Sequence, residues 1–189
     1  MQSKMLKNSN GFTLVETLVA ISILTLSIAG AFTAVQSGIQ SSTFAKDQIT
    51  AFWLAQEGME FIKNRRDENA LNSISGGSAT WLSGLSAVSD DPCWFGGGGV
   101  SQKTCIIDSP IPSNTAPCSL GFGTCPNIKQ DATSGLFGHA SSWTDTNFKR
   151  EIQFQSISAN EVLITIKISW TNRNLAKSFE VTQSLFNRQ

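Results

Sequence analysis

Glu16 is the one charged residue in the apolar stretch of residues 12–35. These 24 residues, FTLVETLVAISILTLSIAGAFTAV, are enough to cross a bilayer as a helix, which needs about 20 apolar residues. A carboxylate inside such a segment costs about 2.5–3.5 kcal/mol, so it requires a partner or a function. Lys4 and Lys7 precede the stretch, and they predict that residues 1–11 stay on the cytoplasmic side.

The string Gly11-Phe12-Thr13-Leu14-Val15-Glu16, with its basic leader and apolar run, resembles the processing site of type IV prepilins and type II secretion pseudopilins. The resemblance implies that a membrane aspartyl peptidase cuts after Gly11 and methylates the new N-terminus at Phe12. It also implies that Glu16 pairs with the N-terminal ammonium of a neighbouring subunit during filament assembly. Both groups are costly when unpaired among apolar helices, so their pairing would drive assembly and fix the axial register.

Two simpler interpretations compete for this N-terminal segment. A secretory signal peptide has an apolar region of about 7–15 residues and a small-residue cleavage site, and residues 12–35 are longer and lack a clear site of that kind. A plain membrane anchor explains the length but gives Glu16 no function. An acid one turn from the helix start can reach the headgroup region, which explains why it is tolerated but not why it follows this cleavage motif.

Four cysteines lie beyond the apolar stretch, at Cys93, Cys105, Cys118 and Cys125. An even number in an exported domain favours disulfides. Pairing of sequence neighbours closes the shortest loops, and a nested pairing is almost as favourable. A zinc site is the alternative, but the chain has no Cys-x-x-Cys pair to form a zinc knuckle.

The composition indicates one exported globular domain behind a membrane segment. The chain has 189 residues with 14 basic and 14 acidic side chains, and charged residues are only 15% of it. About 150 residues remain once the leader and the apolar stretch are set aside, which suits a single domain with a helical stalk. No basic patch indicates a nucleic-acid partner.

Residues 36–70 predict an amphipathic continuation of the apolar helix. They contain no proline, and apolar residues recur three or four positions apart. Glu60 and Lys63 are three apart on the polar side and can form an ion pair. The helix should end between Asp67 and Ser75, before Gly76-Gly77. The predicted stripe comprises Ala45, Ile49, Phe52, Ala55, Met59 and Ile62, broadened by Phe44, Trp53, Leu54 and Phe61.

The C-terminal region 148–189 predicts three antiparallel strands at residues 148–157, 161–171 and 177–185. The middle strand is the clearest, because Val162, Ile164, Ile166, Ile168 and Trp170 alternate on one face. One apolar face of such a meander needs a cover, and the amphipathic helix can provide it. The fold class is therefore α+β, with a long N-terminal helix on a C-terminal antiparallel sheet, as the pilin resemblance also implies.

Residues 71–147 have a different character. They hold all five prolines and eleven of the fifteen glycines, so regular elements should be short and little core should form. Disulfides would hold such a region together. Trp81, Trp94 and Trp143 lie here, and either they pack under the loops or they expose a binding surface for a subunit, a carbohydrate or DNA.

No constellation predicts an enzyme, a cofactor or a metal. His139 is the sole histidine, so a histidine-based triad has at most one candidate, and Ser141 and Ser142 follow it in a loop of small residues. The paired acids Asp67-Glu68 and Asp90-Asp91 lack the Asp-x-Asp-x-Asp-Gly ladder of a calcium loop. The glycine run 96–99 is not followed by the Lys-Ser/Thr of a phosphate loop.

The resemblance therefore implies a structural subunit of a type IV pilus-like filament. Its partners would be other pilin subunits, the prepilin peptidase and the inner-membrane assembly platform. It would wait in the cytoplasmic membrane with its head outside, and then enter a filament. The stretches Leu54-Ala55-Gln56-Glu57-Gly58 and Trp170-Thr171-Asn172-Arg173 are similar to minor subunits of the kind that initiates the tip. The alternatives are a type II secretion pseudopilin and, in another class, a fibre-tip adhesin or DNA-uptake module.

Overall fold

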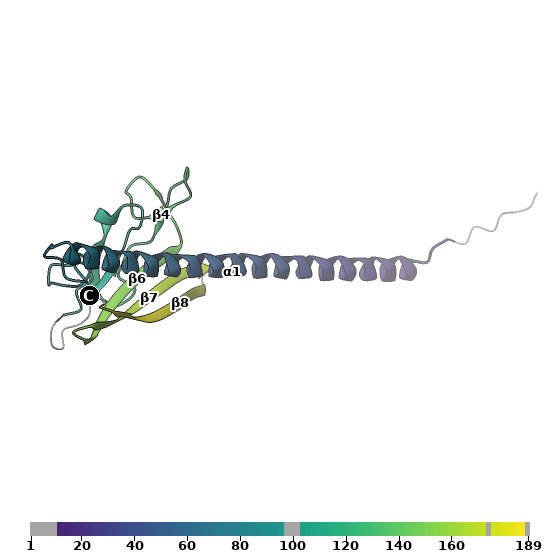
Figure 1. The fold of residues 1–189 in the computed structure, drawn as a ribbon. Coiled ribbons are helices and arrows are strands. Elements are labelled where there is room, and N and C mark those ends of the chain that lie inside the picture. The colour runs from purple at the N-terminus through teal and green to yellow at the C-terminus, as the bar shows by residue number, and fades with distance from the viewer. Residues whose placement is uncertain (1–10, 97–102, 173–174, 188–189) are drawn as a thin grey trace, which may run out of the picture. The chain divides into compact units, whose positions relative to one another are not determined.

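The computed structural model describes residues 11–96, 103–172 and 175–187, so the leader and its Lys4 and Lys7 lie outside the described residues. One long helix, α1 (Leu14–Ile74), continues through the predicted apolar and amphipathic parts without a break (Figure 1). By its internal contacts the chain forms two units, residues 1–46 and residues 47–189, and each is described by itself below.

The head, residues 47–189, has a five-stranded antiparallel sheet in the order β2-β1-β6-β7-β8. The three long strands are β6 (Phe148–Ser158), β7 (Glu161–Asn172) and β8 (Leu175–Phe186). They pair in sequence order, which confirms the predicted meander and the α+β fold. The alternation on β7 is complete, because every second residue from Val162 to Trp170 is buried.

The middle region contributes more to the sheet and core than its composition predicts. It supplies β1 (Lys103–Ile106), which pairs with β6, and β2 (Ala116–Leu120), which pairs with β1. A second, small sheet in the order β4-β3-β5 comprises β3 (Lys129–Gln130), β4 (Phe137–Gly138) and β5 (Thr144–Asp145). A 3-10 turn at Pro112–Asn114 precedes β2. The expectation of little core is wrong, because several side chains of this region are buried, among them Trp81, Leu82, Leu85, Ile107 and Ile128.

The helix buries a stripe that differs from the predicted one. Ala55, Met59 and Ile62 are buried as expected. Ile49 and Phe52 are 59% and 51% exposed, so the N-terminal part of the predicted stripe is wrong. Apolar residues cover more than one side of the helix here, and the sheet contacts only one side. The residues that α1 buries are Ala51, Leu54, Ala55, Gly58, Met59, Ile62, Arg66 and Asn69.

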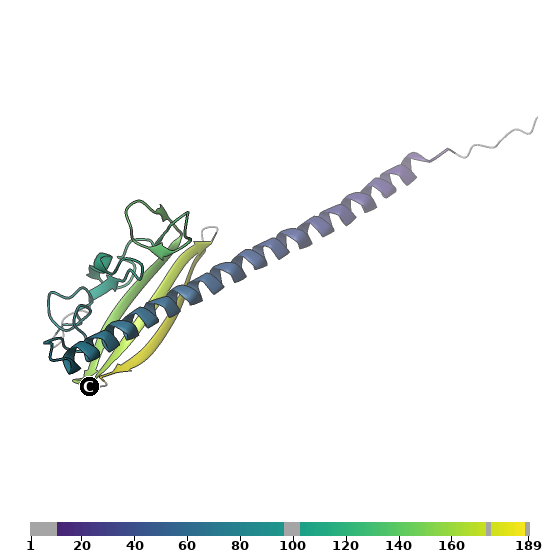
Figure 2. The same ribbon diagram turned by 45° about the horizontal axis from the view of Figure 1, so that its top comes forward.

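Gly58 lies at a close contact between the helix and the sheet. A Cβ atom at this position would lie 3.3 Å from Ile166 Cδ1 and 3.4 Å from Arg150 Cδ. A larger residue here would push the helix away from the sheet. Glycine therefore allows the close packing, although it has a lower helix propensity than other residues. Figure 2 shows this part of α1 lying across the face of β6, β7 and β8.

The helix ends at Ile74, within the predicted interval. Gly76 follows with φ +85°, a left-handed conformation that glycine adopts without strain, and the N–H of Gly77 donates to the carbonyl of Asn72 at 2.9 Å. The buried Asn69 side chain donates to the carbonyls of Trp81 and Ser83, at 3.3 and 3.0 Å. These bonds hold the following loop against the last turns of the helix. The predicted Glu60–Lys63 ion pair is present at 3.2 Å.

Candidate functional site

The candidate processing site lies in the three residues before the helix. Gly11, Phe12 and Thr13 are exposed and non-helical, and α1 begins at Leu14. Phe12 is 77% exposed, and a Cβ atom on Gly11 would meet nothing within 4 Å. The segment is therefore accessible to solvent and lies outside the helix, as cleavage after Gly11 would require.

Thr13 caps the helix at its N-terminus. Its hydroxyl oxygen accepts the N–H of Glu16 at 3.3 Å, and its carbonyl accepts the N–H of Thr17 at 3.2 Å. A threonine followed three residues later by a glutamate is the sequence pattern of a capping box. The structure shows the half of that box in which threonine is the acceptor. The sequence prediction placed Glu16 in assembly or at the headgroup region and missed that this pattern also sets where the helix begins.

Glu16 is exposed in the first turn of α1. A negative charge is favourable at this end of a helix, because the unpaired N–H groups give it a partial positive charge. The carboxylate is therefore compatible with the helix itself and remains available to a second group. An ammonium at Phe12 would be the complementary group, as the resemblance implies.

The hydroxyl side chains of the apolar segment are satisfied by its own backbone. Five of the six donate to the carbonyl three or four residues earlier, at distances of 2.8 to 2.9 Å, and the hydroxyl of Thr13 accepts from Glu16. A hydroxyl bonded in this way does not need water, so it is tolerated in an apolar environment. The residues concerned are Thr17, Ser22, Thr25, Ser27 and Thr33.

By length and composition, α1 includes a segment able to cross a membrane. None of that window is buried within the described structure, and its large apolar side chains are exposed on all sides. An apolar surface of this extent needs lipid or protein around it. The exposed residues include Leu18, Val19, Ile21, Ile23, Leu24, Leu26, Ile28, Phe32 and Val35.

The four cysteines form two disulfides between sequence neighbours, Cys93–Cys105 and Cys118–Cys125, with Cα atoms 5.1 and 5.2 Å apart. The first is buried and joins the loop after α1 to strand β1. The second closes the loop that follows β2. The predicted disulfides are confirmed, and the pairing that closes the shortest loops is the one present.

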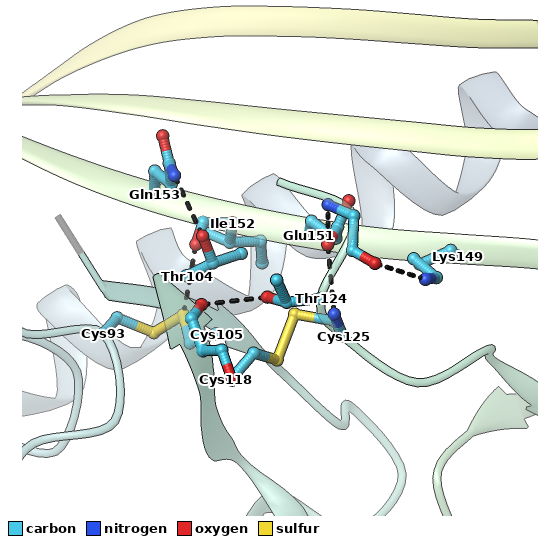
Figure 3. Close-up of a disulfide and its surroundings, with 12 residues drawn as sticks. Cys93, Thr104, Cys105, Cys118, Thr124, Cys125, Lys149, Glu151, Ile152 and Gln153 are labelled. Carbon is cyan, nitrogen blue, oxygen red and sulfur yellow. Dashed lines mark hydrogen bonds between the residues drawn. A yellow bond between two sulfur atoms is a disulfide. The ribbon is translucent and has the colours of Figure 1, made fainter. Parts of the chain in front are cut away.

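The loop closed by Cys118–Cys125 is fixed to the sheet by side chains of β6. The buried Glu151 carboxylate accepts the N–H of Gly123 at 2.7 Å and that of Cys125 at 3.2 Å. Lys149 donates to the carbonyl of Gly123 at 2.9 Å. Figure 3 shows both side chains pointing to this loop from the same strand. The Cys118–Cys125 disulfide therefore keeps in place the two N–H groups that donate to the buried Glu151 carboxylate.

The tryptophans of the middle region are buried or half-buried, which agrees with packing under the loops, one of the two alternatives. Trp81 is 8% exposed and packs in the core, so it offers no binding surface. Trp94 is half-buried and stacks on Phe95 with ring centroids 5.1 Å apart, and Trp143 is half-buried as well. The exposed tryptophan is Trp53 on the helix, at 61%. Sequence periodicity assigned it to the buried face, so this exposed site was missed.

A buried polar cluster surrounds Arg150 on β6, and no motif predicted it. Its guanidinium donates to the carbonyls of Leu54 and Ile107, both at 3.0 Å, and to the Glu57 carboxylate at 3.2 Å. Burial lowers the pKa of Arg150, and the charge of Glu57 opposes that shift. The cluster joins the helix, the sheet and the middle region through one side chain. Position 150 alternates with Phe148 and Ile152, which was the only sequence signal that it faces inward.

His139 is part of the head structure. Its backbone N–H donates to the buried carboxylate of Asp108 at 2.8 Å, and its Nε2 is buried with no partner among the described residues. Asp108 also accepts the N–H of Ile111 and the side-chain amide of Asn114, both at 3.0 Å. Within the described ranges, no group of three or more His, Cys, Asp or Glu side chains is placed to hold a metal ion.

We expect the stability of the head to fall as the pH drops below about 6.5, the ordinary pKa of histidine. Burial, and then the charge of Arg150, lower the pKa of His139 in the folded state. The unfolded chain then binds the proton first, so protonation favours unfolding as the pH falls from that value to the folded-state pKa. Thermal unfolding between pH 7.5 and 5 should show the decrease, and His139→Gln should reduce it. An equal decrease in that variant would contradict the prediction.

The N-terminal segment that contains the candidate processing site matches a known family model. Residues 6–32 match the family model described as the prokaryotic N-terminal methylation motif. Comparison with curated proteins and with solved structures gives no significant match. The chain carries the type IV prepilin-type signature, and the match includes Gly11, Phe12 and Glu16. The motif and the apolar helix together fit a pilin-like or pseudopilin-like structural protein that is anchored in a membrane and carries an external head.

Proposed function

We propose that this chain is a minor structural subunit of a type IV pilus-like filament. A prepilin peptidase cuts it after Gly11 and methylates Phe12, and the N-terminal helix then carries it from the cytoplasmic membrane into the filament. The observation that carries the proposal is the match of residues 6–32 to the N-terminal methylation motif. Other pilin subunits and the inner-membrane assembly platform are its partners in this proposal.

Features of the first unit, residues 1–46, support assembly through the helix. Gly30, Ala34 and Gly38 recur every four residues, and a Cβ atom on either glycine would meet nothing within 4 Å. Small residues at this spacing let neighbouring membrane helices approach closely. The hydroxyls of this segment are bonded internally, so a helix–helix contact need not provide partners for them.

Two residues provide the proposed charge pair. Cleavage after Gly11 creates an ammonium on Phe12, and Glu16 is exposed four residues later. Both charges lose solvation in a bundle of apolar helices, and each is expensive without a partner. A subunit whose ammonium meets the Glu16 of its neighbour removes both costs at once. The assignment to a minor subunit depends on the similarity of residues 54–58 and 170–173, of which Arg173 lies outside the described residues.

The intact mass of the chain, expressed with and without a prepilin peptidase, tests the processing step. With the peptidase, we expect loss of residues 1–11 and the gain of one methyl group at Phe12. Without it, the chain should keep its full mass, and Gly11→Val should keep it in both cases. An uncleaved product in the presence of an active peptidase, or cleavage near residue 30 by a signal peptidase, would overturn the proposal.

A type II secretion pseudopilin remains the second candidate, because the same motif supports it. A pilus subunit is needed for surface pili, whereas a pseudopilin is needed for protein secretion. Deletion of the chain should reduce surface pili if it is a pilus subunit, and it should block release of secreted enzymes if it is a pseudopilin.

A further inference from the structure

Strand β8 forms one edge of the five-stranded sheet. All twelve of its residues pair with β7, in a register without a shift. Among the described residues no strand lies on its other side, and Figures 1 and 2 both draw β8 as the outermost strand. Every second residue of an edge strand directs its N–H and C=O groups away from the sheet. β8 therefore presents a regular ladder of backbone donors and acceptors over its whole length.

The two edges of the sheet differ in how they are protected. At the opposite edge, β2 is five residues long, contains Pro117, has an irregular register with β1 and holds Cys118 of a disulfide. Short strands, proline and irregular pairing are the usual means of preventing strand addition. β8 has none of these three features, although it carries two charged residues, Lys177 on the helix-facing side and Glu180 on the opposite side. The β2 edge is thus protected against strand addition, and the β8 edge is the one at which a further strand can pair with this sheet.

The helix-facing side of β8 is apolar in its centre, between Lys177 and Gln183, and this centre is incompletely covered. Phe179 and Val181 are half-buried against the core, and the Phe52 ring lies 6.2 Å from that of Phe179. Phe52 is 51% exposed, and Ile49 and Trp53 on the same helix are 59% and 61% exposed. A sixth strand beside β8 would place its helix-facing side chains next to this apolar surface. Alternate positions of that strand should therefore be apolar.

Lipid does not account for this surface. The apolar stretch at residues 12–35 already provides the roughly 20 residues that a bilayer needs. A polar stretch, QSGIQSS at residues 36–42, separates it from Ile49. The occupant that matches both the backbone ladder and the apolar flank is a polypeptide segment in an extended conformation.

The opposite side of the sheet specifies the charge of that segment. Glu151 on β6 is the register partner of Lys167 on β7, and Lys167 is the register partner of Glu180 on β8. Charges thus alternate across three strands, and the next position beyond Glu180 calls for a basic residue. A second copy of β8 does not supply it, because the residues on this side are Ala176, Ser178, Glu180, Thr182, Ser184 and Phe186.

We propose that β8 accepts an extended segment of a partner protein as a sixth strand of the sheet. That segment alternates apolar residues, which pack beside Phe179 and Phe52, with polar residues that place a basic side chain opposite Glu180. The backbone ladder provides the affinity, and the two faces provide the specificity. The site lies on the head and is independent of the processing site, so it does not rest on the filament proposal.

Binding of a defined peptide to the full chain in detergent micelles tests the proposal. The probe is a fluorescent ten-residue peptide in which valine alternates with threonine. A lysine replaces the threonine at one central position. We expect saturable binding below 1 mM, with slower hydrogen exchange in β8 and unchanged exchange in β2. A second probe, methylated at the six central amide nitrogens, cannot form the ladder and should not bind. Absence of binding at 1 mM, or equal binding of the methylated probe, would overturn the proposal.

A charge exchange tests the face that the partner uses. Glu180→Lys should weaken binding of the lysine probe by roughly tenfold and strengthen binding of a probe with glutamate in its place, since it replaces a favourable cross-strand charge pair by two like charges. Ser119→Lys on β2 is the matched control at the other edge and should leave both affinities unchanged. If the Glu180→Lys variant keeps its melting temperature and still prefers the lysine probe to the glutamate probe, the basic residue of the partner does not lie opposite Glu180.

Discussion

Replacement of Glu16 by alanine should leave the chain cleaved and membrane-held but reduce its incorporation into filaments by about a hundredfold. The proposed pair is worth about 2.5–3.5 kcal/mol, which is the cost of one unpaired acid within the membrane. Glu16→Ala removes the acid and leaves the Phe12 ammonium of the next subunit without a partner. Mass spectrometry of sheared filaments and of the membrane fraction would measure incorporation and processing separately.

Two control variants test whether the charge of Glu16 is what matters. Glu16→Gln keeps the size and removes the charge, so it should fail as the alanine variant does. Thr25→Val removes a hydroxyl whose hydrogen bond lies within the helix, to the Ser22 carbonyl at 2.9 Å, and it should assemble normally. Normal incorporation of Glu16→Gln would contradict charge pairing and would leave Glu16 as a capping-box residue alone.

Replacement of Arg150 by alanine should destabilise the head by about 3–5 kcal/mol, the usual cost of removing one member of a buried ion pair. The fully buried guanidinium bonds two carbonyls and the Glu57 carboxylate, so its loss leaves acceptors unpaired and a cavity between helix and sheet. Chemical unfolding of the full chain in detergent, with intact disulfides, would measure the loss.

Two further variants separate the contributions to that loss. Arg150→Lys keeps the charge but has one nitrogen in place of a planar fork, so it should recover only part of the stability. Glu57→Gln leaves both carbonyl contacts in place but removes the counter-charge of a fully buried guanidinium, so it should cost about 1–3 kcal/mol, less than Arg150→Ala. A loss below 1 kcal/mol for Arg150→Ala would show that the cluster does not join the helix to the sheet.

Arg150 also illustrates why the sequence left part of the head unpredicted. The pattern Phe148, Arg150, Ile152 alternates, so position 150 shares the inward-facing side of β6, although a charged side chain favours solvent. Acceptors from residues 54, 57 and 107 decide the outcome, and they lie 43 to 96 positions away along the chain. Contacts at such separations leave no local pattern. The same reason explains why β1 was missed, because a four-residue strand is recognised only by its pairing with β6.

The sequence by itself determined the features that depend on local chemistry. The spacing of Gly11, Phe12 and Glu16 identified the motif, the apolar run predicted the helix, and alternation located β6, β7 and β8. Tertiary structure alone decided which side of a broadly apolar helix is buried, which cysteines pair and which sheet edge stays open. These outcomes depend on which distant surfaces meet. Burial of Ala51 in place of Ile49 and Phe52 follows from the narrow contact between one helix and one sheet.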